Sequence, residues 1–297
     1  MRTIAGVLAT LSATACATTA PPARQAALPA APPPGMQYLY GSAEAAALGQ
    51  QAYAVLVADV TAKLAARRRH DVGVQLSVVP ERGSRIDALR FAECGDKPAA
   101  AVFDIDETAL LNLGYEYDEA ANGRSYDAGR WAQWEKGGVD AVVPVPGAVT
   151  AFRALRAAGV TVIANSNRNA AAATETADAL SRAGLGVFRH GETLFLKGDV
   201  GGGSGKDARR AAIADRWCVL ALAGDQVGDF TDLLVAMTPG QRRAAAMAAP
   251  FDTLWGRGWF MLPNPVYGTG LGAGWDESFP PDRRWTAPVG TIETKGN

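Results

Sequence analysis

From Pro98 onward, short apolar runs alternate with longer segments of helical spacing. The apolar runs have the length of strands and occupy residues 99–103, 160–164, 193–196 and 218–223. The helical segments span residues 146–158, 170–183 and 206–215. Strands joined by helices imply right-handed βαβ crossovers and a parallel sheet. We therefore expect an α/β fold with a parallel sheet flanked by helices.

The region before Pro98 and the segment after the first strand predict further elements. Residues 42–69 have helical spacing behind Ser42, which suits an N-cap, and we expect one long helix or two packed on the main domain. Residues 72–79 are a weaker candidate for a strand. Residues 111–143 are rich in Trp and Tyr and contain polar turns.

Polar residues collect at the carboxyl end of each predicted strand. In chain order they are Asp104 and Asp106, then Ser166, Asn167 and Arg168, then Lys197 or Lys206, and finally Asp225 and Asp229. The carboxyl ends of parallel strands meet at one edge of the sheet, and in open α/β sheets this edge carries the ligand site. We therefore expect these side chains to converge there.

Three acids, Asp104, Asp106 and Glu107, lie within four residues after the first strand. Carboxylates this close repel one another unless a cation or hydrogen-bond donors offset their charge. Asp104, Asp106 and Asp225 offer the oxygen ligands that Mg²⁺ prefers. A carboxylate can also attack phosphorus, and a second acid can move the proton of the leaving group. The alternative is that these acids are solvated loop residues.

Several blocks of the sequence, taken together, resemble one family. "DIDET" at 104–108 resembles the first motif of the haloacid dehalogenase (HAD) superfamily, Ser166 its second, and "GDQVGD" at 224–229 its fourth. More narrowly, the chain resembles the class C acid phosphatases, the family of the outer-membrane lipoprotein e 5′-nucleotidases. The narrower matches include "SNR" at 166–168, "SGKDARR" at 204–210 and "LPNPVYG" at 262–268. The resemblance implies a HAD-like Rossmannoid sheet in residues 42–280, a small helical cap near 111–143 and an N-terminal helical extension.

The resemblance also implies roles for the residues at the sheet edge. Asp104 would be the nucleophile and a magnesium ligand. Asp106 would be the general acid and base, and would bind the metal through its backbone carbonyl. Asp225 would complete the protein ligands, Asp229 would support the metal, and Ser166 would hydrogen-bond the transferring phosphoryl group.

A lysine would stabilise the charge of that phosphoryl group. Lys206 matches the family's block, but a Gly-rich insertion precedes it, so Lys197 is the alternative. The expected substrate-binding residues are Asn167, Arg168, Tyr115, Trp131, Trp134 and Tyr267. Trp131 and Trp134 are three residues apart and suit a helix core equally well.

The sequence departs from the family in two places. It reads Leu111-Asn112 where an Asp-Asn pair is expected, and "YGTGLGAGW" at 267–275 where an aromatic residue is expected soon after Tyr-Gly. Both changes fall in the cap and the pocket for the leaving group. They therefore concern the choice of substrate more than the chemistry.

The N-terminus is typical of an exported chain. Residues 1–15 resemble a signal peptide, and Cys16 is a candidate for lipidation, although Ala13 stands where a lipoprotein signal usually has Leu. Simple secretion is the alternative. Residues 16–41 form an Ala- and Pro-rich linker and residues 281–297 a C-terminal tail. We expect a periplasmic protein or a lipoprotein anchored in the outer membrane.

Two further cysteines, Cys94 and Cys218, each precede an apolar run that ends in Asp. If the two runs are parallel neighbours, both cysteines fall at the same edge of the sheet. In an oxidising compartment they could form a disulfide, and two separate buried thiols are the alternative. His70 and His190 show neither zinc-ligand nor nucleophile-relay spacing.

Together these features predict a Mg²⁺-dependent phosphomonoesterase that acts on nucleoside 5′-monophosphates through an aspartyl-phosphate. Alternatives are a phosphatase of other small esters such as sugar phosphates, and a non-catalytic binding or storage protein on the same fold. The formal net charge of −1 and the absence of a long basic run argue against nucleic acid as a partner. A homodimer is a further expectation.

Overall fold

A five-stranded parallel sheet forms the centre of the computed structural model, which describes residues 28–71, 76–201 and 203–287. The strand order is β5-β4-β1-β6-β7. The strands are β1 (Ala99–Phe103), β4 (Thr161–Asn169), β5 (Leu194–Lys197), β6 (Cys218–Gly224) and β7 (Trp259–Met261). The predicted α/β fold with a parallel sheet is therefore confirmed, and β7 is a strand that the sequence did not predict.

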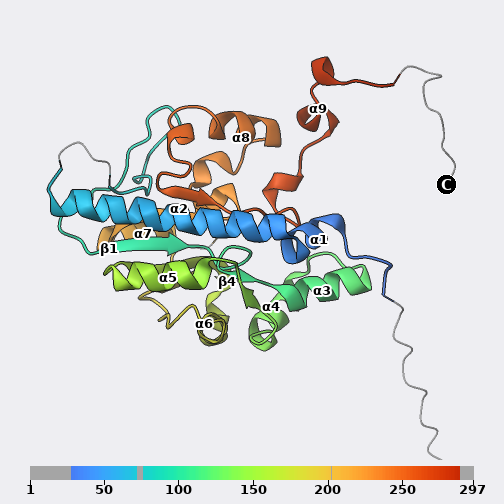
Figure 1. Ribbon diagram of the computed structural model, residues 1–297, viewed down its shortest axis with the longest axis horizontal. Coiled ribbons are helices and arrows are strands. Elements are labelled where there is room, and N and C mark those ends of the chain that lie inside the picture. The colour runs from blue at the N-terminus through green and yellow to red at the C-terminus, as the bar shows by residue number, and fades with distance from the viewer. Residues whose placement is uncertain (1–27, 72–75, 202, 288–297) are drawn as a thin grey trace, which may run out of the picture.

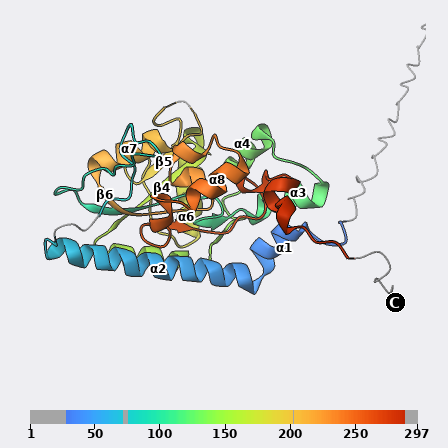
Figure 2. The same ribbon diagram turned by 90° about the horizontal axis from the view of Figure 1, so that it is seen from above.

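Helices cover both faces of this sheet (Figures 1 and 2). They include α2 (Ala43–Arg68), α5 (Ala148–Ala157), α6 (Ala173–Arg182) and α7 (Asp207–Arg216). Alternate residues of β1 belong to two separate apolar cores, one shared with α2, α5 and α6 and the other with α7. Burial on both faces explains why this strand is a continuous apolar run.

The sequence predicted one long helix or two over residues 42–69, and the structure has one, α2. Ser42 accepts a hydrogen bond from the backbone N–H of Ala45 at 3.0 Å, so it caps the helix as predicted. Tyr53 and Leu56 of α2 pack into the same core as Phe103 of β1. Among the described residues, no helix combines the length and apolarity needed to cross a bilayer.

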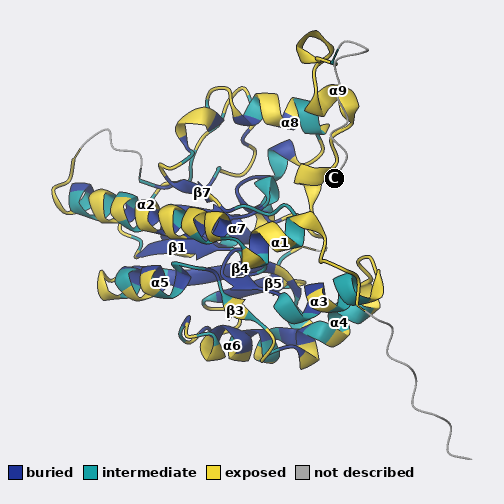
Figure 3. Ribbon diagram, turned by 45° about the vertical axis from the view of Figure 1, so that its right-hand side comes forward, coloured by how far each residue is buried: buried dark blue, intermediate teal, exposed yellow. Residues whose placement is uncertain are grey.

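Residues 111–143 fold beside the sheet, between two short strands that pair with each other. β2 (Leu110–Leu111) and β3 (Val143–Pro144) are antiparallel and bracket α3 (Leu113–Asn122) and α4 (Ala128–Gly137). The remaining α-helices are α1 (Pro34–Gly41), α8 (Pro239–Ala246) and α9 (Trp275–Ser278). The strands of the five-stranded sheet lie mostly buried among the helices, whereas the segment that carries α9 is exposed (Figure 3).

Two expectations about strands were wrong. The strand expected at 160–164 continues to Asn169, because β4 pairs with β5 again at Asn169 after a shift of register beyond Asn165. Residues 76–79 are not a strand, and residues 72–75 of that expectation lie outside the described residues. Val78 is instead held in irregular chain, where its N–H donates to Val219 and its carbonyl accepts from the Trp259 indole.

Cys94 and Cys218 form a disulfide, which settles the alternative left open by the sequence. Cys218 is the first residue of β6, and β1 and β6 are parallel neighbours, as the argument from the sequence required. The bond therefore lies at the amino end of these strands, at the edge of the sheet opposite to the acidic residues.

Candidate active site

The pairing of β1 with β6 brings Asp104 and Asp225 together. The N–H of Asp104 donates to the carbonyl of Ala223 at 2.9 Å, so the ladder between the two strands continues to the nucleophile candidate. Asp225 follows β6 directly, and Asp229 lies one short turn later. One carboxylate oxygen from each of these three aspartates lies within 4.8 Å of the others.

Gly224 allows Asp229 to approach this closely. A Cβ atom at residue 224 would lie 2.2 Å from the Cβ of Asp229, much closer than two carbon atoms can come. Asp229 is also fixed by its own turn, because its carboxylate accepts from the backbone N–H of Gln226 at 2.8 Å. In the block "GDQVGD" at 224–229, the packing of Asp229 therefore requires glycine at position 224.

The three aspartates lie in a site that disfavours their negative charge. Burial raises the pKa of Asp104 well above its usual range, and Asp229 raises it further. Burial and Asp229 also raise the pKa of Asp225 to about 7. A cation at this position would stabilise the charged carboxylates, and three hard oxygen donors are a set that suits a divalent metal.

Lys206 is the lysine of this site. Its ammonium is buried, 2.7 Å from Asp104 and 2.6 Å from Asp229. Burial lowers the pKa of Lys206, but the two aspartates outweigh it and hold the pKa above the usual value. Lys197, the alternative from the sequence, is exposed at the end of β5 and does not line the cavity described below.

Asp106 is held by a different set of partners. Its carboxylate accepts from Arg168 Nε and from Asn112 Nδ2, both at 2.9 Å. Arg168 is buried and also donates to Asn112 Oδ1 at 2.9 Å. Ser166 completes the group with its hydroxyl 3.4 Å from Asp106. Asp106, in the loop after β1, therefore meets Ser166 and Arg168 of the neighbouring strand β4.

Glu107 is a site residue to which the sequence assigned no role. It has a left-handed backbone with φ of 52°, which is unusual for a residue with a side chain. Its buried carboxylate accepts from Tyr40, from Tyr267 and from both the backbone and side-chain amides of Asn112. Burial and Asp106 raise its pKa to about 8. The only signal for this role was its place inside the first motif.

Two amide side chains lie close to these groups. Asn264, from the matched block at 262–268, donates to Asp225 at 2.8 Å. Asn167 is exposed, lines the cavity and accepts from Arg209 Nη2 at 2.6 Å.

A cavity of about 750 Å³ opens over these residues. Asp104, Asp106, Lys206, Asp225 and Asp229 lie on its lining. The cap side contributes Tyr115, Glu116, Glu119, Tyr126 and Trp131, and the C-terminal side contributes Tyr267. Ligand pockets in proteins have volumes of this order.

The two tryptophans of α4 have different surroundings. Trp131 lines the cavity, and its ring packs edge-on against Tyr115 with a centroid distance of 4.9 Å. Trp134 is not among the lining residues and packs against Gly114 and Gly138, where an added Cβ would clash with its ring. The expected binding role therefore has a structural basis at Trp131, whereas Trp134 is half-buried and packs against the glycines and Tyr115 within the cap.

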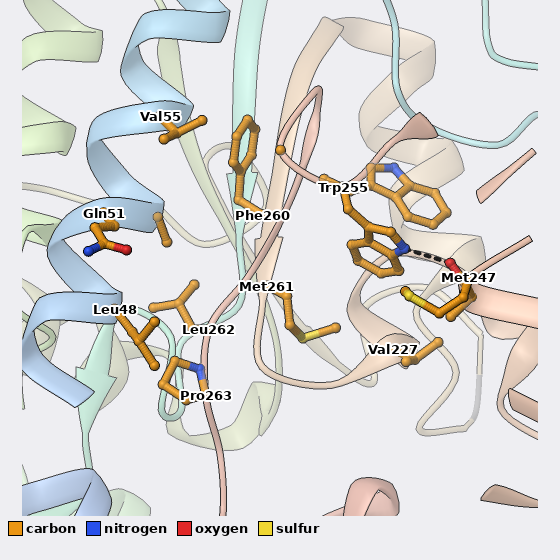
Figure 4. Close-up of a pocket in the computed structure, with 14 residues that line it drawn as sticks. Leu48, Gln51, Val55, Val227, Met247, Trp255, Phe260, Met261, Leu262 and Pro263 are labelled. Atoms are coloured by element: carbon orange, nitrogen blue, oxygen red, sulfur yellow. Dashed lines mark hydrogen bonds between the residues drawn. The ribbon is translucent and has the colours of Figure 1, made fainter. Parts of the chain in front are cut away.

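A second hollow of about 570 Å³ lies between α2 and β7 (Figure 4). Leu48 and Val55 of α2 face Phe260 and Leu262 across it, and Trp255 and Met247 close the far side. Its lining contains no titratable side chain. It therefore offers no group for acid–base or metal chemistry and is distinct from the cavity over the aspartates.

Comparisons with known proteins find a matching family and a similar fold. The family model described as HAD superfamily, subfamily IIIB (acid phosphatase) matches residues 67–270. The solved structure of the class C acid phosphatase from Bacillus anthracis is similar with a TM-score of 0.62 and 22% identity, covering 80% of this chain and 84% of that one. A structure of the same enzyme with tungstate bound has the same score and identity, covering 83% and 89%.

Proposed function

Because the chain belongs to the acid phosphatases of HAD subfamily IIIB, and so to the phosphomonoesterases, we propose that it is a Mg²⁺-dependent enzyme that hydrolyses nucleoside 5′-monophosphates. The observation that carries the proposal is the meeting of Asp104, Asp225 and Asp229 around one point, with Lys206 beside them. A nucleophile, a cation site and a fixed positive charge are the parts that phosphoryl transfer needs.

The donor set fits Mg²⁺. Asp104 and Asp225 would hold the ion through carboxylate oxygens and Asp106 through its backbone carbonyl, with Asp229 in support. When bound, the ion would neutralise charge on the phosphoryl oxygens.

The residues of the chain then have defined tasks. An oxygen of Asp104 forms a bond to phosphorus while the bond to the leaving oxygen breaks, and Asp106 gives that oxygen its proton. Asp106, now charged, takes a proton from water, whose oxygen attacks phosphorus and releases phosphate from Asp104. Lys206 stabilises the charge of the phosphoryl group, and Ser166 hydrogen-bonds it.

The cap side of the cavity supports a nucleoside as leaving group. Its lining includes four aromatic residues, Tyr115, Tyr126, Trp131 and Tyr267. Aromatic side chains can stack on any nucleobase. A sugar phosphate would leave most of this aromatic surface without a partner. Comparing kcat/KM for adenosine 5′-monophosphate and glucose 6-phosphate separates the two substrates.

The central test replaces Asp104 by Asn in the full chain. We expect the variant to lose hydrolysis of p-nitrophenyl phosphate, because an amide cannot attack phosphorus as a carboxylate does. Asp215→Asn, at an exposed ion pair with Arg82, is the matched control and should keep the rate. A chelator should remove wild-type activity and added Mg²⁺ should restore it. Near-normal turnover by Asp104→Asn would refute the proposal.

We also propose that the chain is exported and anchored by a lipid on Cys16. Residues 1–27, which include the expected signal peptide and Cys16, lie outside the described residues. The Cys94–Cys218 disulfide supports export, because such bonds persist in oxidising compartments. The homodimer stays a prediction.

A further inference from the structure

Glu116 differs from the other acids that line the cavity over the aspartates. It is only 4% exposed, and its Oε2 is buried without a hydrogen-bond partner among the described residues. Such an atom is costly, because burying a carboxylate without donors forfeits its hydration. A buried acceptor that lines a ligand cavity and has no protein donor suggests that the ligand supplies one.

The neighbouring acids all have partners. Asp232 accepts from the backbone of Lys206 and Asp207, and Glu119 pairs with Arg130. Arg130 also contacts the Tyr115 hydroxyl and the Ser125 carbonyl, and no hydrogen bond or ion pair joins it to Glu116. Burial and the charges of Glu119 and Asp106 raise the pKa of Glu116 to about 7, in spite of Arg130.

The position of Glu116 in α3 indicates which part of the substrate it meets. Its backbone N–H donates to the carbonyl of Asn112, whose side chain holds Asp106. Glu116 therefore lies four residues, about 6 Å along the axis, beyond the residue that orients the proton donor. The aromatic rings of Tyr115 and Trp131 line the cavity on the same side. Phosphate, sugar and base follow in this order in a nucleotide.

Resting on the proposed function, we propose that Glu116 binds the sugar of the substrate by accepting hydrogen bonds from its 2′- and 3′-hydroxyl groups. It would thereby make the enzyme prefer ribonucleotides to deoxyribonucleotides. A neighbouring diol offers two donors to one carboxylate, which satisfies the unpartnered oxygen. Glu116 is then a residue that determines specificity and takes no part in the bond-breaking steps.

The experiment compares kcat/KM for adenosine 5′-monophosphate with the values for its 2′-deoxy and 3′-deoxy analogues. Hydrogen bonds to a charged group are strong, so the wild type should favour the ribonucleotide by about tenfold to a hundredfold. In Glu116→Leu the ratio should fall towards one, and in Glu116→Gln, which keeps an acceptor without charge, it should fall partway. Asp118→Asn on the same helix removes a charge outside the cavity and should keep the wild-type ratio.

The ratio separates this role from a structural one, because a loss of folding lowers both rates equally. If Glu116→Leu does not fold, the inference is tested by the ratio of kcat/KM values in the wild type and in Glu116→Gln. A wild type without ribose preference, or a Leu variant that keeps it, overturns the inference. Faster turnover of aminoethyl phosphate than of the nucleotide overturns it in favour of an ammonium ligand. By contrast, a wild type that hydrolyses no nucleotide better than p-nitrophenyl phosphate refutes the proposed substrate class itself.

Discussion

Removing the Cys94–Cys218 disulfide should destabilise the protein strongly without harming its chemistry. The two cysteines are 124 residues apart, and the loop-entropy relation gives about 16 cal/mol/K, or about 5 kcal/mol at 25 °C, for closing such a loop. Measured losses for native disulfides are about 2–5 kcal/mol. We therefore expect the Cys94→Ala/Cys218→Ala variant to lose about 3–5 kcal/mol of unfolding free energy.

Urea unfolding, followed by tryptophan fluorescence, measures this loss. With a slope of about 3 kcal/mol/M, the midpoint should fall by about 1–1.7 M urea. Reduced wild-type protein should unfold near the midpoint of the variant, and the variant should not respond to reductant. In the absence of urea the variant should keep its phosphatase activity, because the bond lies at the sheet edge opposite to Asp104. A wild-type midpoint that reduction does not move would show that the bond is absent or that it stabilises nothing.

Two matched pairs of variants test the assignments within the site. Lys206→Met should lower kcat by about a hundredfold to a thousandfold, because it removes a buried positive charge beside the proposed phosphoryl site. Lys197→Met, at an exposed position, should keep the wild-type kcat. Equal rates in the two variants would contradict the choice of Lys206. Trp131→Leu should raise KM for adenosine 5′-monophosphate by about tenfold through lost stacking, whereas Trp134→Leu should leave KM unchanged and lower the unfolding free energy by about 1–3 kcal/mol. A thermal melt and a substrate titration of both tryptophan variants check this, and a reversed pattern would exchange their roles.

The fold could be predicted where apolar periodicity sets it. The strands at 99–103 and 218–223 are buried on both faces, so their apolar runs mark them clearly. The extension of β4 to Asn169 gives no such signal, because residues 165–169 are polar, and Ser166 and Arg168 among them contact Asp106. β7 has three residues and is defined by its pairing with β6, which only the folded chain provides.

The sequence could predict those site residues that directly follow the carboxyl ends of parallel strands. The convergence of Asp104 and Asp225 follows from strand direction. Strand direction could not choose between Lys197, at the end of β5, and Lys206, at the start of α7, and only the folded chain places Lys206 beside Asp104. The contact of Tyr40 with Glu107 joins residues 67 positions apart, and no local pattern announces it. Glu116 was missed for the same kind of reason, because an acid in a helix gives no signal of burial until the helix is placed.

Asn112 shows why the cap and the chemistry belong to one unit. The residue stands at the start of α3, and its side chain donates to Asp106 and accepts from Arg168. Its backbone N–H donates to Glu107, which the two tyrosines from α1 and from the segment after β7 also hold. A shift of α3 would therefore move Asp106, the proposed proton donor, and a change at Asp106 would move the helix that carries Glu116. If Asp106 protonates the leaving group and Glu116 selects it, as proposed, then one amide fixes both parts of the chain, and selection and proton transfer can be tuned only together.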